Sequence, residues 1–280
     1  MTTSVEPISG PKPTQGATMV DIQSSRDNRN VAIDRVGVKD VTYPITLKVP
    51  NSDKPQTTVA SINMYVALPH HKKGTHMSRF LEVLNQETSE PLTPEMIPGI
   101  ARAICKRLDA AEAHFEAKFT YFIKKLAPVT GTPGLMDYRV SFECTANGVE
   151  DFIMGVSAPA TSLCPCSKEI SDYGAHNQRC QISAKVRFKG NYWIEDLVKH
   201  LESAASTQVF ATLKRPDEKW VTERAFENPK FVEDIVRDLA VSLNGDDRIL
   251  WYSIDSENFE SIHNHNAYAQ LSRDKRIATA

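Results

Sequence analysis

The feature that most constrains the fold is an order of segment types that occurs twice along the chain. Two alternating apolar and polar segments, typical of β-strands, are followed by two helical patterns and then by two further strand patterns. In the first half these segments are residues 41–50, 58–69, 78–86, 93–114, 114–128 and 136–148. In the second half they are residues 150–163, 180–190, 193–206, 228–243 and the strand, turn and strand of 249–271.

This order predicts an α+β protein of two tandem modules, because each pair of amphipathic helices needs a sheet face to cover. Each module is expected to be an antiparallel sheet with two helices on one face. We place the first module at residues 31–150 and the second, which carries most of the candidate site, at residues 151–280. Residues 1–30 are polar and rich in Pro, Gly, Ser and Thr, which predicts a disordered N-terminal arm.

Charge and composition narrow the class of protein. The formal net charge of −2 gives no basic excess, so nucleic acid is not an expected partner. No apolar run approaches the length of a membrane span, and the N-terminus lacks the pattern of a secretory signal. The odd count of five cysteines argues against a disulfide framework. We therefore expect a cytoplasmic protein whose clustered cysteines serve metal binding or catalysis.

The segment Ser162–Cys180, "SLCPCSKEISDYGAHNQRC", concentrates reactive side chains. Thiolate and imidazole are good ligands for zinc and similar divalent ions, so Cys164, Cys166 and His176 are candidates. A C-x-C pair chelates one ion poorly, because adjacent side chains of an extended segment point apart. This favours one cysteine as a ligand and the other as a separate group. The alternative is that the cysteines are inert residues of a loop.

Acidic and basic residues gather further along. The run Lys214–Lys219 is predicted as a solvated loop. Asn228 is predicted to cap the next helix, and Glu233 lies at the edge of its apolar stripe, whereas Asp234 points away from it. Glu233 should therefore be half-buried near a helix N-terminus, which favours its charged form. The alternative is an acid that only complements the helix dipole.

Two more segments carry candidate groups. In "ENFESIHNHNAYA", Glu257, Glu260, His263 and His265 can supply acids and bases for proton transfer, or can be exposed residues of a polar loop. If His263 and His265 lie on one strand, they share a face. The run "PHHKKGTHMSRF", which includes Arg79, can contact phosphates or can be an exposed basic loop.

These segments together resemble the type IB GTP cyclohydrolase I family of prokaryotes. The resemblance rests on "SLCPCSKEISDYGAHNQR", "RNVAIDRVGVKDVTYPI", "HHKKGTHMSRFLE", "LKRPDEKWVTERAFENPKFVED" and "ESIHNHNA", which occur in the family's order. It extends from about residue 20 to about residue 270. The resemblance implies the tunnelling fold, with two such modules fused in each chain. It also implies a homotetramer with active sites at subunit interfaces.

The resemblance also implies an activity and a set of site residues. The family converts GTP and water to formate and 7,8-dihydroneopterin triphosphate, the first step of tetrahydrofolate biosynthesis, with a bound divalent metal such as Zn, Mn or Fe. By position, Cys164, His176 and Glu218 match the metal ligands and Glu233 matches the acid that anchors guanine. The positions near the reacting ring are matched by Cys166, Glu260 and His263. Basic residues for the triphosphate are available at Lys214, Arg215, Arg79, Lys168 and Arg179.

Other activities remain as alternatives. A nitrile reductase of the same fold uses a lone nucleophilic cysteine, and the "GAHNQR" segment argues against it. An archaeal-type enzyme would give a cyclic phosphate product with iron. A metal-stabilised nucleotide-binding protein would show no turnover.

Overall fold

The computed structural model describes residues 21–277, so residues 1–20 of the predicted N-terminal arm lie outside the described residues. The described end of that segment runs beside the loop before the first helix. The Asp27 N–H donates to the carbonyl of His71 (3.0 Å), and the Gly74 N–H donates to the carbonyl of Gln23 (3.1 Å). Residues 23–27 are therefore attached to the first half of the chain.

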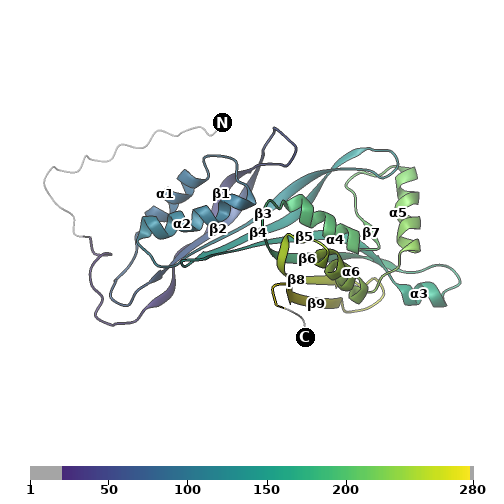
Figure 1. Cartoon of the computed structure of the whole chain (residues 1–280). Coiled ribbons are helices and arrows are strands. Elements are labelled where there is room, and N and C mark those ends of the chain that lie inside the picture. Colours follow the sequence, from purple (N-terminus) through teal and green to yellow (C-terminus); the bar gives the residue numbers. More distant parts are fainter. Residues whose placement is uncertain (1–20, 278–280) are drawn as a thin grey trace.

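The elements follow the repeated order (Figure 1). The first half contains β1 (Ile33–Leu47), β2 (Gln56–Leu68), α1 (Met77–Glu87), the 3-10 helix η1 (Pro94–Met96), α2 (Ile97–Leu108), β3 (Ala113–Leu126) and β4 (Pro133–Ala146). The second half contains β5 (Glu150–Leu163), α3 (Pro165–Ile170), β6 (Asn177–Phe188), α4 (Ile194–Ala204), β7 (Thr207–Gln208), α5 (Arg215–Glu227), α6 (Val232–Asn244), β8 (Ile249–Asn258) and β9 (Ala267–Asp274). No helix among residues 21–277 is both long enough and apolar enough to cross a membrane.

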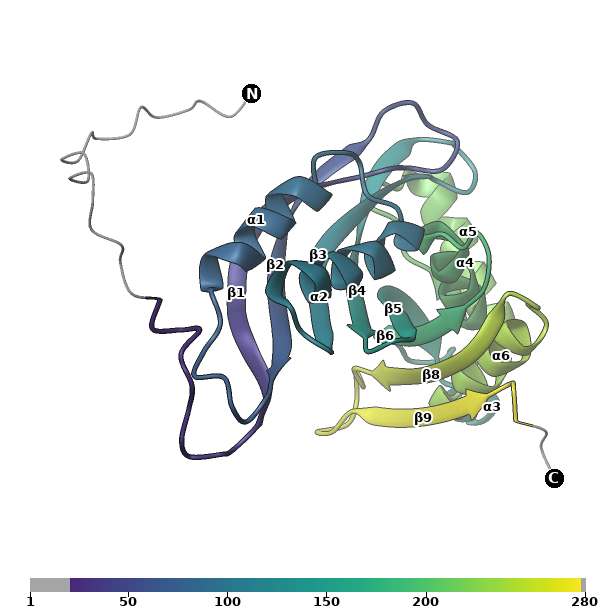
Figure 2. The same cartoon turned by 60° about the vertical axis from the view of Figure 1, so that its left-hand side comes forward.

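All strands belong to one antiparallel sheet in the order β1-β2-β3-β4-β5-β6-β8-β9, with β7 paired to β5. The halves join at the β4–β5 hairpin, where residues 139–146 pair with residues 150–157. Figure 2 shows α1 and α2 lying over the first strands, and α6 beside the strands of the second half.

Both helix pairs cover the same face of the sheet. The register connects one row of directly opposed residues across the two halves: Ile62, Ala117, Phe142, Met154, Val186 and Tyr252. All six side chains are buried in a single hydrophobic core. The helices contribute apolar stripes to this core, for example Ile97, Ile100 and Ile104 of α2 and Ile235, Leu239 and Leu243 of α6. The predicted antiparallel sheet with helices on one face is therefore confirmed.

Two local predictions were wrong. The run Lys214–Lys219, expected as a solvated loop, lies at the start of α5, which buries only Asp217 and Ala225 and so lacks the apolar stripe that marks a helix. Helix α6 begins at Val232, not after Asn228, whose side chain donates instead to the carbonyls of Ala205 and Ser206. The condition that His263 and His265 lie on one strand is not met, because both lie in the turn between β8 and β9, where their rings stack at 5.2 Å.

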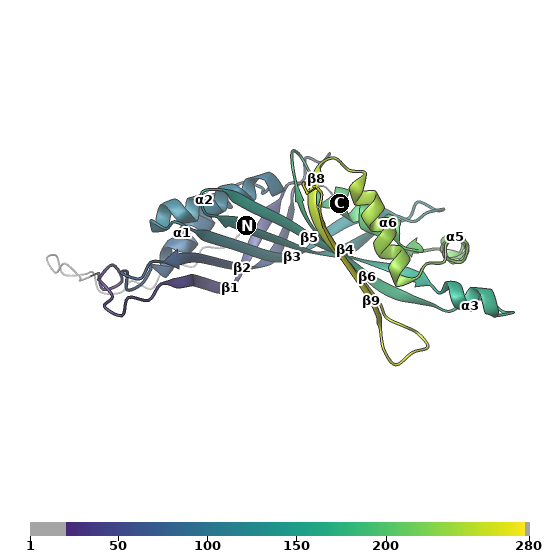
Figure 3. The same cartoon turned by 60° about the horizontal axis from the view of Figure 1, so that its bottom comes forward.

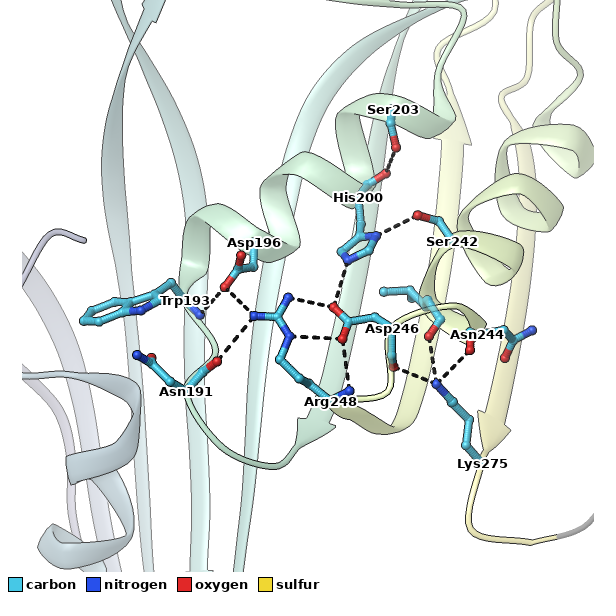
Figure 4. A network of polar contacts seen from close by, with 11 residues as sticks. Asn191, Trp193, Asp196, His200, Ser203, Ser242, Asn244, Asp246, Arg248 and Lys275 are labelled. Carbon is cyan, nitrogen blue, oxygen red and sulfur yellow. Dashed lines mark hydrogen bonds and ion pairs between the residues drawn. The ribbon is translucent and has the colours of Figure 1, made fainter. Parts of the chain in front are cut away.

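A polar network fixes α4 and α6 to the start of β8 (Figure 4). Arg248 donates to both carboxylate oxygens of Asp246 (3.0 and 2.8 Å) and to Asp196 (3.2 Å), which accepts the Trp193 N–H at the start of α4. His200 Nδ1 lies 2.7 Å from Ser242 Oγ of α6.

Lys275 completes this network at the C-terminal end of α6. Its ammonium group donates to the carbonyls of Leu243, Asn244 and Asp246, at 3.0, 3.0 and 2.8 Å. These contacts satisfy carbonyls that the end of a helix otherwise leaves without a partner. The segment after β9 therefore acts as part of the end cap of α6.

Asp246 is expected to give the fold an acid-sensitive contribution to stability. The hydrogen bonds from Arg248 lower the pKa of Asp246 to about 2, below its ordinary value of 3.8. The folded state therefore binds fewer protons, so the stabilisation is complete above about pH 4 and is lost as the pH falls through about 2. Asp246→Asn should lower the free energy of unfolding by about 1–3 kcal/mol at pH 7.

Urea unfolding at pH 7, 4 and 3 tests this prediction, with the exposed neighbour Asp247→Asn as the control. The difference in free energy of unfolding between the parent protein and Asp246→Asn should become smaller below pH 4. Equal losses in the two variants at pH 7 would contradict a special role for Asp246.

Candidate functional site

The candidate site lies where β5 ends and β6 begins. Leu163 and Asn177 are paired, and the Cys164 N–H donates to the carbonyl of His176 (3.1 Å), so Cys164 and His176 lie opposite each other. Opposed residues of neighbouring strands present their side chains on the same side. Cys164 also caps α3, because its Sγ accepts the Ser167 N–H at 3.5 Å. Cys166, two residues on, is exposed.

The His176 ring is held by an amide. Its Nδ1 lies 3.0 Å from Gln178 Oε1 and 3.3 Å from Ser261 Oγ. An amide oxygen only accepts, so Nδ1 carries the proton and Nε2 keeps its lone pair. Because a histidine that binds a metal through one nitrogen commonly donates its other N–H to such an acceptor, this arrangement leaves Nε2 suited to a ligand.

Gln178 joins His176 to Glu260. The Gln178 Nε2 donates to Glu260 Oε1 at 3.5 Å, and Glu260 is half-buried at the start of the turn between β8 and β9. The structure thus connects three predicted site residues from two segments: Cys164 and His176 of Ser162–Cys180, and Glu260 of the β8–β9 turn. In the same turn, His263 is exposed.

A buried polar cluster supports this group. Gln178 and Asn258 both donate to Ser162 Oγ (3.4 and 3.1 Å), and Ser162 donates to the carbonyl of Lys230 (3.1 Å). Ser162, Gln178 and Asn258 are between 1 and 6% exposed. The sequence analysis missed these three residues. The available signal was their strand position, because each falls in the alternation that otherwise places apolar residues in the core.

Glu218 lies in the first turn of α5, exposed, together with the exposed Lys214 and Arg215 at the start of the helix. The contact between α3 and α5 is at the other end of α5, where Lys168 donates to the carbonyl of Phe226 (2.6 Å). Eight residues of helix separate Phe226 from Glu218, a rise of about 12 Å. Figure 3 shows α3 and α5 at the same end of the molecule.

Asp217 fixes the start of α5 and hence the position of Glu218. Its buried carboxylate accepts the N–H groups of Val129 and Thr130 (2.9 Å each), the Thr130 hydroxyl (2.7 Å) and the Lys214 N–H (2.8 Å). Burial alone would raise the pKa of Asp217, but these hydrogen bonds outweigh it and lower the pKa to about 2. Asp217 therefore stays charged and ties α5 to the β3–β4 turn.

The described part of the chain, residues 21–277, brings no three His, Cys, Asp or Glu side chains close enough together to hold a metal ion. Cys164 and His176 are neighbours, and among residues 21–277 Glu218 does not join them in such a group. The ligand set of Cys164, His176 and Glu218 stays a prediction.

Glu233 is exposed, so the prediction that it is half-buried was wrong for the single chain. Asp234, predicted to point away from the core, is the half-buried residue, because its carboxylate turns back to accept the Phe231 N–H (2.9 Å). The start of α6 nevertheless lies beside the end of β5, since the Lys230 N–H donates to the carbonyl of Leu163 (3.0 Å).

Arg79 lies apart from these residues. It is half-buried in the first turn of α1, in a pocket that it lines with Lys72, His76 and Asp109. Figures 1 and 3 place α1 at the opposite end of the molecule from α3 and α5. Within one chain, Arg79 is therefore remote from Cys164.

Comparison with known proteins decides the family. Residues 19–269 match the family model described as "GCHY-1: Type I GTP cyclohydrolase folE2". A GTP cyclohydrolase FolE2 of Syntrophobacter fumaroxidans is 54% identical over 259 residues, which cover 92% of this chain and 100% of the relative. A GTP cyclohydrolase FolE2 of Geobacter sulfurreducens is 54% identical over 260 residues, which cover 93% of this chain and 100% of the relative. The chain belongs to the type I GTP cyclohydrolase FolE2 family.

Solved structures confirm the fold class of this FolE2 family member. Uricase from Arthrobacter globiformis superposes with a TM-score of 0.52 at 8% identity, over 88% of this chain and 95% of that one. A uricase from Bacillus fastidious superposes with a TM-score of 0.52 at 10% identity, over 89% of this chain and 95% of that one. The shared architecture is the tunnelling fold, and at this identity the likeness concerns the fold alone.

Gln178 is expected to determine the tautomer of His176 in the FolE2 site. Gln178→Leu removes the acceptor, so the ring should populate both neutral tautomers, whereas Gln178→Glu keeps an acceptor and should retain the proton on Nδ1. Nitrogen-15 NMR of the His176 ring in metal-free protein measures this directly. Ser261→Ala, which removes only the longer contact, is the control. An unchanged ring spectrum in Gln178→Leu would refute the assignment.

Proposed function

We propose that this chain converts GTP and water to formate and 7,8-dihydroneopterin triphosphate, the first step of tetrahydrofolate biosynthesis, at the end of the β5–β6 hairpin. The observation that carries the proposal is the Cys164 and His176 pair, joined to Glu260 through Gln178. These residues occupy segments within the range that matches the FolE2 family model. The group offers a thiol beside an imidazole, and a carboxylate that an amide joins to the imidazole.

Cys164, His176 and Glu218 would hold a divalent metal, Zn, Mn or Fe. The donor set fits, because a soft thiolate, an imidazole nitrogen and a carboxylate suit several such ions. His176 presents Nε2, since Gln178 occupies Nδ1. When bound, the metal supplies Lewis-acid activation of the water that adds to C8 of guanine.

Glu233 would recognise the guanine base. An ionised carboxylate can accept from both N1–H and the 2-amino group, donors that adenine lacks at these positions. Its exposure in the single chain leaves it available to a ligand, and the start of α6 lies beside the end of β5. Lys214 and Arg215, exposed at the start of α5, would meet the triphosphate.

Arg79 would also contact the triphosphate, but only from another subunit. It lies on α1, at the other end of the chain from Cys164. The proposal therefore includes a homotetramer whose active sites lie at subunit interfaces, so that one subunit supplies the metal site and another supplies α1. An assembly also offers a way to bring Glu218 within reach of Cys164 and His176.

Cys166, Glu260 and His263 would move the protons. Opening of the imidazole ring and loss of formate each require proton transfer at a ring nitrogen or at the formyl group. Glu260 is half-buried and hydrogen-bonded to Gln178, so its position is fixed before substrate binds. Cys166 and His263 are exposed and can approach a bound purine from α3 and from the β8–β9 turn.

The test of this function is incubation of the purified protein with GTP and Mn²⁺ or Zn²⁺. We expect pterin fluorescence, release of formate, and loss of both after chelation. Cys164→Ala should abolish turnover and reduce bound metal by elemental analysis, whereas Cys105→Ser on α2 should change neither. Mass spectrometry separates the triphosphate from a cyclic phosphate product, and binding of GTP without turnover would indicate the non-catalytic alternative. Full metal content in Cys164→Ala would remove Cys164 from the ligand set.

Base recognition is tested by Glu233→Gln. The amide offers a donor where guanine also presents donors, so GTP binding should weaken by about 2–4 kcal/mol. Metal content should stay at the level of the parent protein. The exposed Glu90→Gln is a matched control. Parent-like GTP affinity in Glu233→Gln, measured by calorimetry, would be incompatible with this role.

A further inference from the structure

The sheet face opposite the helices carries a continuous row of residues without large apolar side chains: serines, a threonine, a glycine and two lysines. The register joins them as direct partners across the eight strands of the main path: Thr42, Ser61, Lys118, Ser141, Gly155, Lys185, Ser253 and Ser272. They alternate with the buried row, so their side chains point away from α1, α2, α4 and α6. Strands of an ordinary exposed face carry longer or branched side chains, which favour strand formation.

A second row on the same face adds hydroxyl groups and a guanidinium group. Thr120, Arg139, Ser157, Ser183 and Asp255 are successive direct partners. Ser157 donates to Ser183 at 2.9 Å. The two rows line a groove of about 910 Å³ across the middle of the sheet.

Gly155 lies at the centre of this groove. It lies on the central strand β5, between Ser141 and Lys185. A Cβ at this position would lie 2.4 Å from Ser141 Oγ, well inside contact distance. The glycine therefore leaves room for the hydroxyl of the half-buried Ser141 to lie against β5.

The charges of the groove are unbalanced. Lys185 is paired with Glu143 at 2.8 Å, but within residues 21–277 neither Lys118 nor Arg139 has a side-chain hydrogen bond or an ion pair. The two are diagonal neighbours on β3 and β4, a separation that long side chains can bridge.

Nearby acids do not compensate these two cations. Glu116, two residues before Lys118, is held by Arg35 (3.1 Å) and Asn63 (2.9 Å). Asp137, two residues before Arg139, has no ion pair in the described chain. Asp255 is the only carboxylate among the described residues that line the groove, and burial raises its pKa, which weakens its competition with an anion.

We propose that this groove is a binding site for a phosphate-type oxyanion, held between Lys118 and Arg139 by charge-assisted hydrogen bonds and by the hydroxyl of Ser141. Several convergent N–H and O–H donors with two cations suit the oxygens of phosphate or pyrophosphate. The site is distinct from that of Cys164, because nine residues of β5 separate Gly155 from Cys164, about 30 Å along the strand. A nucleotide bound at Cys164 of the same chain does not span this distance, so the inference does not depend on the proposed function.

Calorimetric titration of the full chain, kept metal-free with a chelator, tests the proposal with inorganic phosphate and pyrophosphate as probes. We expect saturable binding of pyrophosphate with one site per chain. Lys118→Gln combined with Arg139→Gln should weaken it at least tenfold, and Ser141→Ala should weaken it less. The matched control, Lys54→Gln combined with Arg29→Gln, removes the same charges from exposed positions outside the groove and should bind like the parent protein.

Two further measurements sharpen the result. Competition by GTP against pyrophosphate would show that the site takes the phosphate tail of a nucleotide, whereas no competition would indicate free phosphates, and either supports an oxyanion site. Absence of saturable binding, or equal weakening in both double variants, would overturn the proposal. Unchanged binding of pyrophosphate in Lys118→Gln/Arg139→Gln would also overturn the proposal. If that variant also formed a smaller assembly in size-exclusion chromatography, the groove would be an interface between copies.

Discussion

The structure depends on one constraint, the unbroken register of the sheet across both halves of the chain. A slip by one residue at the β4–β5 hairpin would move every side chain of one half to the opposite face. Phe142 would then no longer align with Met154, and the helices α4 and α6 would face serines and lysines instead of the core. The single hydrophobic core, the site at the strand ends and the groove on the opposite face all follow from this alignment.

The same alternation explains how a polar site is built on an apolar sheet. Ser162, Gln178 and Asn258 occupy buried, core-facing positions near the ends of β5, β6 and β8. Because each is buried, each needs a hydrogen-bond partner, and they partner one another. The cluster thus orients His176 through residues that are not themselves proposed to bind the metal or to transfer protons.

Much of the fold was predictable because its signals are local. The alternation of β2 and the stripes of α2 and α6 each follow from the period of the element. Helix α5 was not predictable in this way, because a buried carboxylate, Asp217, holds it in place rather than an apolar face. The exposure of Glu233 and the distance of Arg79 from Cys164 depend on tertiary packing, which no local pattern encodes.

The capped end of α6 has a consequence for the other end of the helix. Lys275 donates to the last carbonyls of α6, and Glu233 lies in the first turn, about 18 Å away along the helix axis. If α6 tilted by about 5° about its C-terminal end, Glu233 would move by roughly 1.5 Å. A shift of that size is enough to spoil the alignment of a carboxylate with a base. Lys275, which follows β9, therefore helps to fix the position of Glu233, the carboxylate proposed to bind guanine, at the other end of α6.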